Sequence, residues 1–228
     1  MRLNALASDY DGTLAHDGVV EESTLRALET FRSSGRKLIL VTGRELADLA
    51  KVFSRFDLFD RIVAENGAVL FTPATEETRV LAEPPKSEFI TALKSRGVRP
   101  ISVGDVIVAT REPNETAVLE VIRDLGLELQ VIFNKGAVMV LPSGVNKVSG
   151  LKAALAEMDL AESNVAGVGD AENDHAFLHF CGFSAAVANA LPSVKGTANL
   201  TTRASHGAGV VELIEMILNG ELANYAPA

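Results

Sequence analysis

The sequence predicts an α/β fold in which a parallel sheet carries an inserted α+β unit. Short apolar runs alternate with amphipathic stretches near the N-terminus, a pattern typical of parallel strands buried on both faces between helices. The same alternation resumes near the C-terminus. Between these two regions, the order helix, strand, strand occurs twice, with turn signals typical of hairpins.

The first region, residues 1–82, contains three predicted strands separated by two predicted helices. Leu25, Leu28 and Phe31 form the apolar face of the first helix, and Gly35 is suited to end it. In order, we expect a strand at 5–8, a helix at 23–34, a strand at 38–41, a helix at 45–56 and a strand at 62–64.

The middle region, residues 83–145, has a different pattern. Turns at 104–105 and 134–136 join strands that are close in sequence, so these strands are expected to pair antiparallel. A sheet that covers the rest of the protein must face it, so we expect substrate contacts from these turns and strands. The expected elements are a helix ending at Arg96, strands at 98–103 and 106–110, a helix at 114–125, and strands at 127–133 and 137–141.

The last region, residues 146–228, returns to the pattern of the first. Because both ends of the chain alternate in this way, we expect 1–82 and 146–228 to build one core, with 83–145 inserted as a smaller domain. The expected elements are a helix after Lys147, a strand at 165–168, a helix after Asn173, a strand at 184–188 and a helix at 209–218.

Composition and charge limit the classes of function. The chain has 228 residues, of which 47% are hydrophobic and 22% charged, as in ordinary globular proteins. A net charge of −9, without any run of basic residues, argues against a nucleic-acid or anionic-membrane partner. No stretch reaches the roughly 20 apolar residues of a membrane span, and no signal-peptide pattern is present. With Cys181 as its one cysteine, the chain is expected to be cytoplasmic.

The string Asp9-Tyr10-Asp11-Gly12-Thr13 follows the first predicted strand. Ligands of open parallel sheets bind at the carboxyl ends of the strands, where this string falls. If the strand continues, Asp9 and Asp11 share a face and their carboxylates crowd one site, a repulsion that a hard cation would offset. Gly12 permits a sharp turn. A strand end with an ordinary Asp-Gly turn accounts for most such strings in isolation, so the choice depends on the motifs at the other strand ends.

Two further positions lie at predicted helix starts. In Val41-Thr42-Gly43-Arg44, the Thr42 hydroxyl and nearby N–H groups can hold an anionic oxygen, or Thr42 can simply cap the helix. Lys147 begins a helix, where a cation opposes the helix dipole. Such a locally unfavourable choice can mark a functional position.

A fourth string, Gly167-Val168-Gly169-Asp170-Ala171-Glu172-Asn173-Asp174, closes a predicted strand with acids suited to Mg²⁺ or to a helix start. The chain carries four motifs in the order Asp-x-Asp, Thr, Lys and Gly-Asp-x-x-Asn-Asp. In this it resembles, over its whole length, the haloacid dehalogenase superfamily of aspartate-nucleophile phosphotransferases. The insertion is similar to the type IIB cap of the Cof-like branch, as are the strings Glu65-Asn66-Gly67-Ala68, Ala188-Asn189-Ala190 and Gly209-Val210.

This resemblance implies a Rossmann-like core under an α+β cap and a role for each motif residue. Asp9 would be the nucleophile that forms an aspartyl-phosphate, and Asp11 would protonate the leaving oxygen and then activate water. The groups implied to hold the phosphoryl oxygens are Thr42, Gly43, Lys147 and Asn173. The implied Mg²⁺ ligands are Asp9, the backbone carbonyl of Asp11, Asp170 and, directly or through water, Asp174.

The activity implied is that of a Mg²⁺-dependent phosphatase acting on a small phosphorylated metabolite such as a sugar phosphate or phosphoglycolate. A phosphotransferase or phosphomutase similar to phosphomannomutase is the alternative. A receiver domain also assembles acids, Thr and Lys, but it is about half as long and lacks the insertion. A non-catalytic binding protein with a retained site is a further alternative. We expect a monomer or a homodimer.

Overall fold

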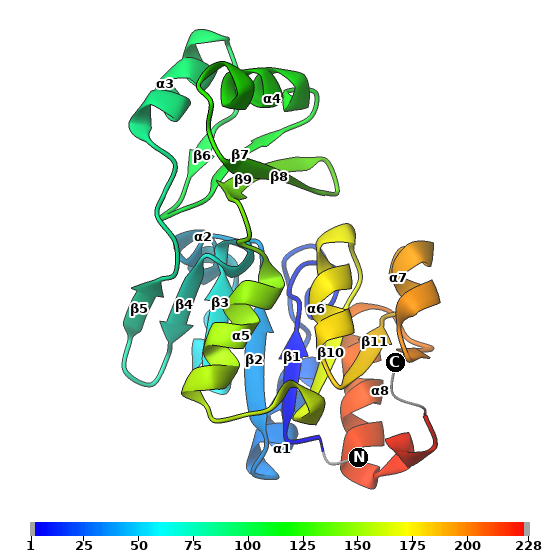
Figure 1. Ribbon diagram of the computed structural model, residues 1–228. Helices are drawn as coiled ribbons and strands as arrows, with labels where there is room; N and C mark the ends of the chain where they lie inside the picture. Colours follow the sequence, from blue (N-terminus) through cyan, green and yellow to red (C-terminus); the bar gives the residue numbers. More distant parts are fainter. Residues whose placement is uncertain (1–2, 226–228) are drawn as a thin grey trace.

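The computed structural model describes residues 3–225 and contains two sheets (Figure 1). The larger sheet has eight strands in the order β12-β11-β10-β1-β2-β3-β4-β5. Its strands are β1 (Ala5–Ser8), β2 (Lys37–Val41), β3 (Arg61–Ala64), β4 (Val69–Thr72), β5 (Glu77–Val80), β10 (Val165–Gly169), β11 (Phe183–Ala186) and β12 (Leu200–Thr201).

Six of these strands are parallel, and β1 lies at their centre. Continuous apolar runs predicted five of the six, all except β12. Every residue of β1 and β10 is buried, and the small side chains of both strands allow helices to pack closely on the sheet. In register, Ser8 lies beside Leu40 of β2 and Val168 of β10. The carboxyl ends of β1, β2 and β10 therefore meet at the same edge.

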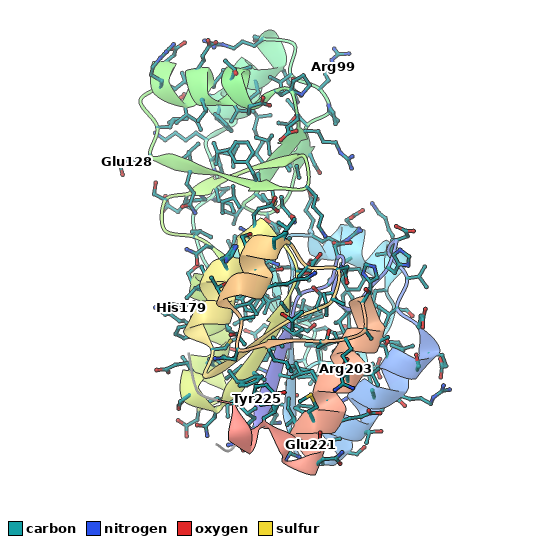
Figure 2. The ribbon with its side chains drawn as sticks, turned by 90° about the vertical axis from the view of Figure 1, so that its right-hand side faces the viewer. Arg99, Glu128, His179, Arg203, Glu221 and Tyr225 are labelled. Atoms are coloured by element: carbon teal, nitrogen blue, oxygen red, sulfur yellow. The ribbon has the colours of Figure 1, made fainter. Side chains whose placement is uncertain are left out.

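Helices cover both faces of the larger sheet. Figure 2 shows α5 and α6 on one side of the strands, with α1 and α8 on the other. The core helices are α1 (Glu22–Ser33), α2 (Leu46–Val52), α5 (Lys147–Glu157), α6 (His175–Phe180), α7 (Pro192–Thr197) and α8 (His206–Asn219). None of the helices in the described residues is both long and apolar enough to cross a membrane.

The antiparallel pair β4 and β5, the helix α7 and the short strand β12 were not expected from the sequence. The four residues of β5 are all exposed, so they carry no pattern of burial. The helix predicted at 45–56 ends at Val52, because the backbone of Phe53 is extended. A turn of 3-10 helix, Phe56–Leu58, follows it.

The smaller sheet has the order β6-β7-β9-β8, and all its neighbouring strands are antiparallel. Its elements fall within the region predicted as an insertion, at 83–145, and Figure 1 shows them above the carboxyl edge of the larger sheet. We call this part the cap. Its elements are α3 (Ser87–Ser95), β6 (Ser102–Val103), β7 (Val108–Arg111), α4 (Glu115–Asp124), β8 (Leu129–Asn134) and β9 (Ala137–Pro142).

The cap has its own apolar core, in which α3 and α4 pack on one face of its sheet through residues such as Phe89, Val118 and Val138. The strand predicted at 98–103 is reduced to Ser102–Val103, because Pro100 has no N–H with which to continue a ladder. The opposite face of the sheet, which carries Met139, faces the larger sheet.

One buried carboxylate joins the cap to the core. Glu65 directly follows β3, is 2% exposed, and accepts hydrogen bonds of 2.8 Å from the backbone N–H groups of Asp105, Val106 and Ile107 in the cap. Gly104 lies so close to this carboxylate that a side chain there would overlap it. This contact holds the β6–β7 turn of the cap against the end of β3.

Candidate active site

Four motif residues converge where the parallel strands end. Asp9 follows β1, Thr42 follows β2, and Asp170 follows β10. The backbone N–H of Asp9 bonds to the carbonyl of Val168 at 3.0 Å, which ties the ends of β1 and β10 together. Lys147 enters this group as the first residue of α5.

Lys147 is a fully enclosed cation rather than a surface residue. Its side chain is 1% exposed, and its Nζ lies 2.5 Å from Asp9 Oδ1 and 2.6 Å from Asp174 Oδ1. Asn146 caps α5 through its side chain, which accepts hydrogen bonds from two backbone N–H groups of the first turn. The helix start also passes so close to Gly67 that a side chain there would overlap the carbonyl of Asn146. Both features position the ammonium.

Asp174 organises the loop that carries Asp170. Its Oδ2 accepts hydrogen bonds from the backbone N–H groups of Asp170 at 2.8 Å and Ala171 at 2.9 Å, while its Oδ1 binds Lys147. The side chain of Asp170 accepts a 3.2 Å hydrogen bond from the Thr13 hydroxyl. Both carboxylate oxygens of Asp174 are thus occupied by protein groups.

Three carboxylates in this cluster lie close enough together that they could hold a metal ion. Oxygen atoms of Asp9, Asp170 and Asp174 lie within 4.8 Å of one another, and all three residues are buried. Carboxylate and carbonyl oxygens are the ligands that Mg²⁺ prefers, so the chemistry of the donors fits a hard divalent cation. The cluster also includes the sequence-predicted metal residues except for the side chain of Asp11.

Burial shapes the acid–base behaviour of the cluster. It raises the pKa of Asp9 to about 8, against the opposing attraction of Lys147, and the nearby Asp174 adds to the increase. Burial also raises the pKa of Asp170. For Lys147, burial alone lowers the pKa, but the attraction of Asp174 and Asp9 outweighs it and the net pKa is raised. A bound divalent cation would favour the ionised carboxylates.

The side chain of Asp11 pairs with Arg44. The two guanidinium contacts are 2.7 Å from Arg44 Nε to Asp11 Oδ2 and 2.8 Å from Arg44 Nη2 to Asp11 Oδ1. The expectation that the carboxylates of Asp9 and Asp11 share a face required the strand to continue through both residues. That condition is not met, because β1 ends at Ser8 and the chain turns at Gly12, whose φ is +88°. Arg44 also binds Asp48 at 2.7 Å.

The predicted phosphate-binding residues border the same site. Thr42 is buried, and its hydroxyl accepts a 3.1 Å hydrogen bond from the N–H of Arg44. Gly43 lines the cavity described below. Asn173 donates a 3.0 Å hydrogen bond to Asn66 Oδ1, while its own Oδ1 is buried without a partner among residues 3–225. The sequence did not assign Asn66 a role, although it lies in one of the strings that resemble the Cof-like branch.

Lys135, in the β8–β9 turn of the cap, reaches into the carboxylate cluster. Its Nζ lies 2.6 Å from Asp170 Oδ2 and 3.4 Å from the backbone carbonyl oxygen of Asp11. These are two of the oxygens that the resemblance assigns to the metal. The turn was expected to contact the substrate, but no feature of the sequence indicated this contact with Asp170.

A cavity of about 470 Å³ lies between the cap and the core, directly beside Asp9. Its floor is charged and includes Arg44, Asp48 and Lys51. The cap contributes Arg111 together with uncharged side chains, some of them polar, such as Asn134, and others small or apolar. The cavity is large enough for a small metabolite and opens next to the carboxylate cluster.

Comparisons with known proteins agree with this geometry. A family model described as haloacid dehalogenase-like hydrolase matches residues 6–103 and 105–214. A phosphoglycolate phosphatase of Methanothermobacter thermautotrophicus is 32% identical, over 95% of this chain and 99% of its own. A crystal structure from Thermoplasma acidophilum superposes with a TM-score of 0.83 at 15% identity, covering 96% of this chain and 99% of the other. A sugar phosphatase of HAD subclass IIB superposes with a TM-score of 0.75 at 21% identity, covering 95% and 99%.

Proposed function

Because this chain belongs to the haloacid dehalogenase-like hydrolases, we propose that it is a Mg²⁺-dependent phosphatase that acts on a small phosphorylated carboxylate through an aspartyl-phosphate. The observation that carries this proposal is the buried cluster of Asp9, Lys147 and Asp170 beneath the cap. A nucleophilic carboxylate, a fixed cation and a metal site within one enclosed space are the parts that phosphoryl transfer requires.

Asp9 is the proposed nucleophile. One of its oxygens attacks phosphorus in line with the ester oxygen, so the new O–P bond forms as the bond to the leaving oxygen breaks. Lys147 lies 2.5 Å from Asp9 Oδ1 and favours the ionised form that can attack. The same ammonium is placed to stabilise negative charge that develops on the phosphoryl oxygens, as are Thr42 and Gly43 at the end of β2.

Asp11 is the proposed general acid and base. It gives a proton to the leaving oxygen and then takes one from the water that attacks the aspartyl-phosphate, which restores Asp9 and releases inorganic phosphate. Asp11 already lines the cavity, but its carboxylate must leave the two hydrogen bonds of Arg44 to reach the leaving oxygen. A substrate that enters beside Arg44 favours this movement if it offers the guanidinium another anion.

The residues that would hold Mg²⁺ are Asp9, Asp170 and the backbone carbonyl of Asp11. When bound, the ion would supply positive charge against the phosphate and the two carboxylates. We assign Asp174 a supporting role, because its oxygens already accept hydrogen bonds from Lys147 and from two backbone N–H groups. This supporting role follows from the hydrogen bonds of the side chain, which leave little room for a metal.

The substrate class rests on the cavity and on the relatives. A volume of about 470 Å³ suits a small molecule. Arg111, a lining cation without an acidic partner among residues 3–225, suits a molecule with a second negative charge besides its phosphate. Phosphoglycolate, which carries a carboxylate next to its phosphoester, has these properties. The relative that is 32% identical is a phosphoglycolate phosphatase, and the similarity extends over 99% of its length, which supports the same substrate.

A phosphate-release assay on purified protein tests this proposal. We expect inorganic phosphate from phosphoglycolate with Mg²⁺ present and none after chelation with EDTA. Asp9→Asn should abolish turnover, whereas Asp159→Asn, an exposed position after α5, should leave it unchanged. Full activity in Asp9→Asn would refute the mechanism. Transfer of the phosphoryl group to a second hydroxyl, in place of phosphate release, would identify a phosphotransferase instead.

A further inference from the structure

Of the three cationic side chains that line the cavity, Arg111 differs from the others because it has no acidic partner within the described part of the chain. Arg44 binds Asp11 and Asp48, and Lys51 lies 3.8 Å from Asp48. The guanidinium of Arg111 forms no hydrogen bond or ion pair with any of residues 3–225. Its charge is therefore available to a molecule that enters the cavity.

The cap sheet directs Arg111 toward the site. Arg111 ends β7 and lies beside Ala137 of β9, which in turn lies beside Asn134 of β8. Cross-strand neighbours of this kind carry their side chains on the same face of a sheet. All three residues line the cavity, so this face is the one turned toward Asp9.

The surroundings of Arg111 leave space for a ligand. Ala109 and Ala137, the small residues beside it, also line the cavity. Strands are about 4.8 Å apart, so the backbone of Arg111 lies about 10 Å from that of Asn134, two strands away. The next residue, Lys135, already touches Asp170. Asp9 and Arg111 both line this cavity, so a small molecule bound at Asp9 shares the cavity with the guanidinium.

We infer that Arg111 determines specificity by binding the carboxylate of the substrate, an assignment that rests on the proposed phosphatase function. A guanidinium presents two parallel N–H donors that match the two oxygens of a carboxylate. Arg44 is less suited to this task, because both of its donor edges are occupied by Asp11 and Asp48. A substrate with an uncharged end offers Arg111 no charged partner, so we expect the site to hydrolyse it less efficiently.

The test compares two substrates that differ only at the end distant from the phosphate. Phosphoglycolate carries a carboxylate there, and 2-hydroxyethyl phosphate carries an alcohol on the same two-carbon frame. We expect Arg111→Met to lower kcat/KM for phosphoglycolate about 10- to 150-fold, the equivalent of the 1.5–3 kcal/mol of a hydrogen bond to a charged group. Hydrolysis of 2-hydroxyethyl phosphate should change less than about twofold, since it makes no such bond.

Two further variants sharpen the comparison. Arg111→Lys keeps the charge but loses the paired donors, so we expect it to recover only part of the preference for phosphoglycolate. Arg123→Met removes the same kind of side chain from α4, the helix on the opposite face of the cap sheet, and should leave both substrates unaffected. A specific loss in Arg111→Met alone supports carboxylate recognition.

The possible failures can be told apart. If Arg111→Met lowers hydrolysis of both substrates equally, or if the unmodified protein does not prefer phosphoglycolate, the assignment of Arg111 is wrong while the phosphatase function stands. If the unmodified protein releases phosphate from neither compound with Mg²⁺ present, the proposed function itself is wrong, and this assignment is overturned with it.

Discussion

Replacing Lys147 with methionine tests whether the buried cation stabilises the folded protein by compensating the charge of the buried carboxylates. The ammonium is 1% exposed and contacts Asp9 at 2.5 Å and Asp174 at 2.6 Å. Methionine has a similar length and fills the same space, so the variant removes the charge without opening a large cavity. The two carboxylates then remain buried without this partner.

The expected cost follows from the contacts. With an effective dielectric constant of about 20, each contact corresponds to a gross attraction of about 6–7 kcal/mol, most of which is offset by desolvation of the charged groups. Removing one partner from such a buried pair costs about 3–5 kcal/mol. We therefore expect the free energy of unfolding of metal-free Lys147→Met to fall by about this amount at pH 9.

The loss should depend on pH in a defined direction. Burial already raises the pKa of Asp9 to about 8, and removal of Lys147 raises it further. Above about pH 8 the folded variant then binds more protons than the folded parent protein, so its relative stability falls as the pH rises. The difference between variant and parent should be largest at pH 9 and smaller at pH 6.

Urea unfolding followed by far-UV circular dichroism, with EDTA at pH 6, 7.5 and 9, measures both effects. Lys152→Met, an exposed position on the same helix, is the matched control. A loss below about 1 kcal/mol at pH 9, the size expected of a surface ion pair, would refute the reasoning. So would a larger loss that does not change with pH.

Three further predictions concern the same site and its surroundings. Gly12→Ala should weaken Mg²⁺ binding and phosphate release at least tenfold, because φ is +88° and the new Cβ would lie 2.5 Å from both Asp170 Oδ2 and Lys135 Nζ. The control is Gly18→Ala, where φ is +79° but no atom lies near the new Cβ. It should lower the free energy of unfolding by only the backbone cost of about 1–2 kcal/mol. Lys135→Met should bind Mn²⁺ several-fold more tightly by isothermal titration calorimetry, since the ammonium occupies oxygens assigned to the metal; equal affinities would contradict this. Burial raises the pKa of the Cys181 thiol, so iodoacetamide at pH 8 should label the native protein only slowly by mass spectrometry, and rapid labelling would show that the thiol is accessible.

Much of the core could be predicted because its signals are local. Continuous apolar runs predicted the strands at 5–8, 38–41 and 165–168, and each is a buried parallel strand. The pair β4 and β5 could not be found in this way. β5 is exposed along its whole length, so its place in the sheet comes from pairing with β4 rather than from a buried face.

The site shows the same division. Registered parallel strands bring their ends to one edge, so motifs at strand ends predicted a cluster of acids, and Asp9 and Asp170 are indeed together there. The partner of Asp11 could not be predicted in this way. Its pairing with Arg44 depends on where β1 ends and how the chain turns after it. A shift of the strand end by one residue would change the direction of the side chain, and the sequence pattern does not define strand ends that finely.

By itself, the sequence determined the alternation of strands and helices, the positions of the motifs at strand ends and the family to which they belong. These features follow from burial periodicity and turn chemistry, which act between residues close in the chain. The tertiary structure decided which charges meet. Lys147 lies between Asp9 and Asp174, and Lys135 of the cap contacts Asp170. Arg111 faces the cavity with no partner among the residues that the structure describes. Such pairings depend on how distant elements pack, because a charge finds its partner only across the space that folding encloses.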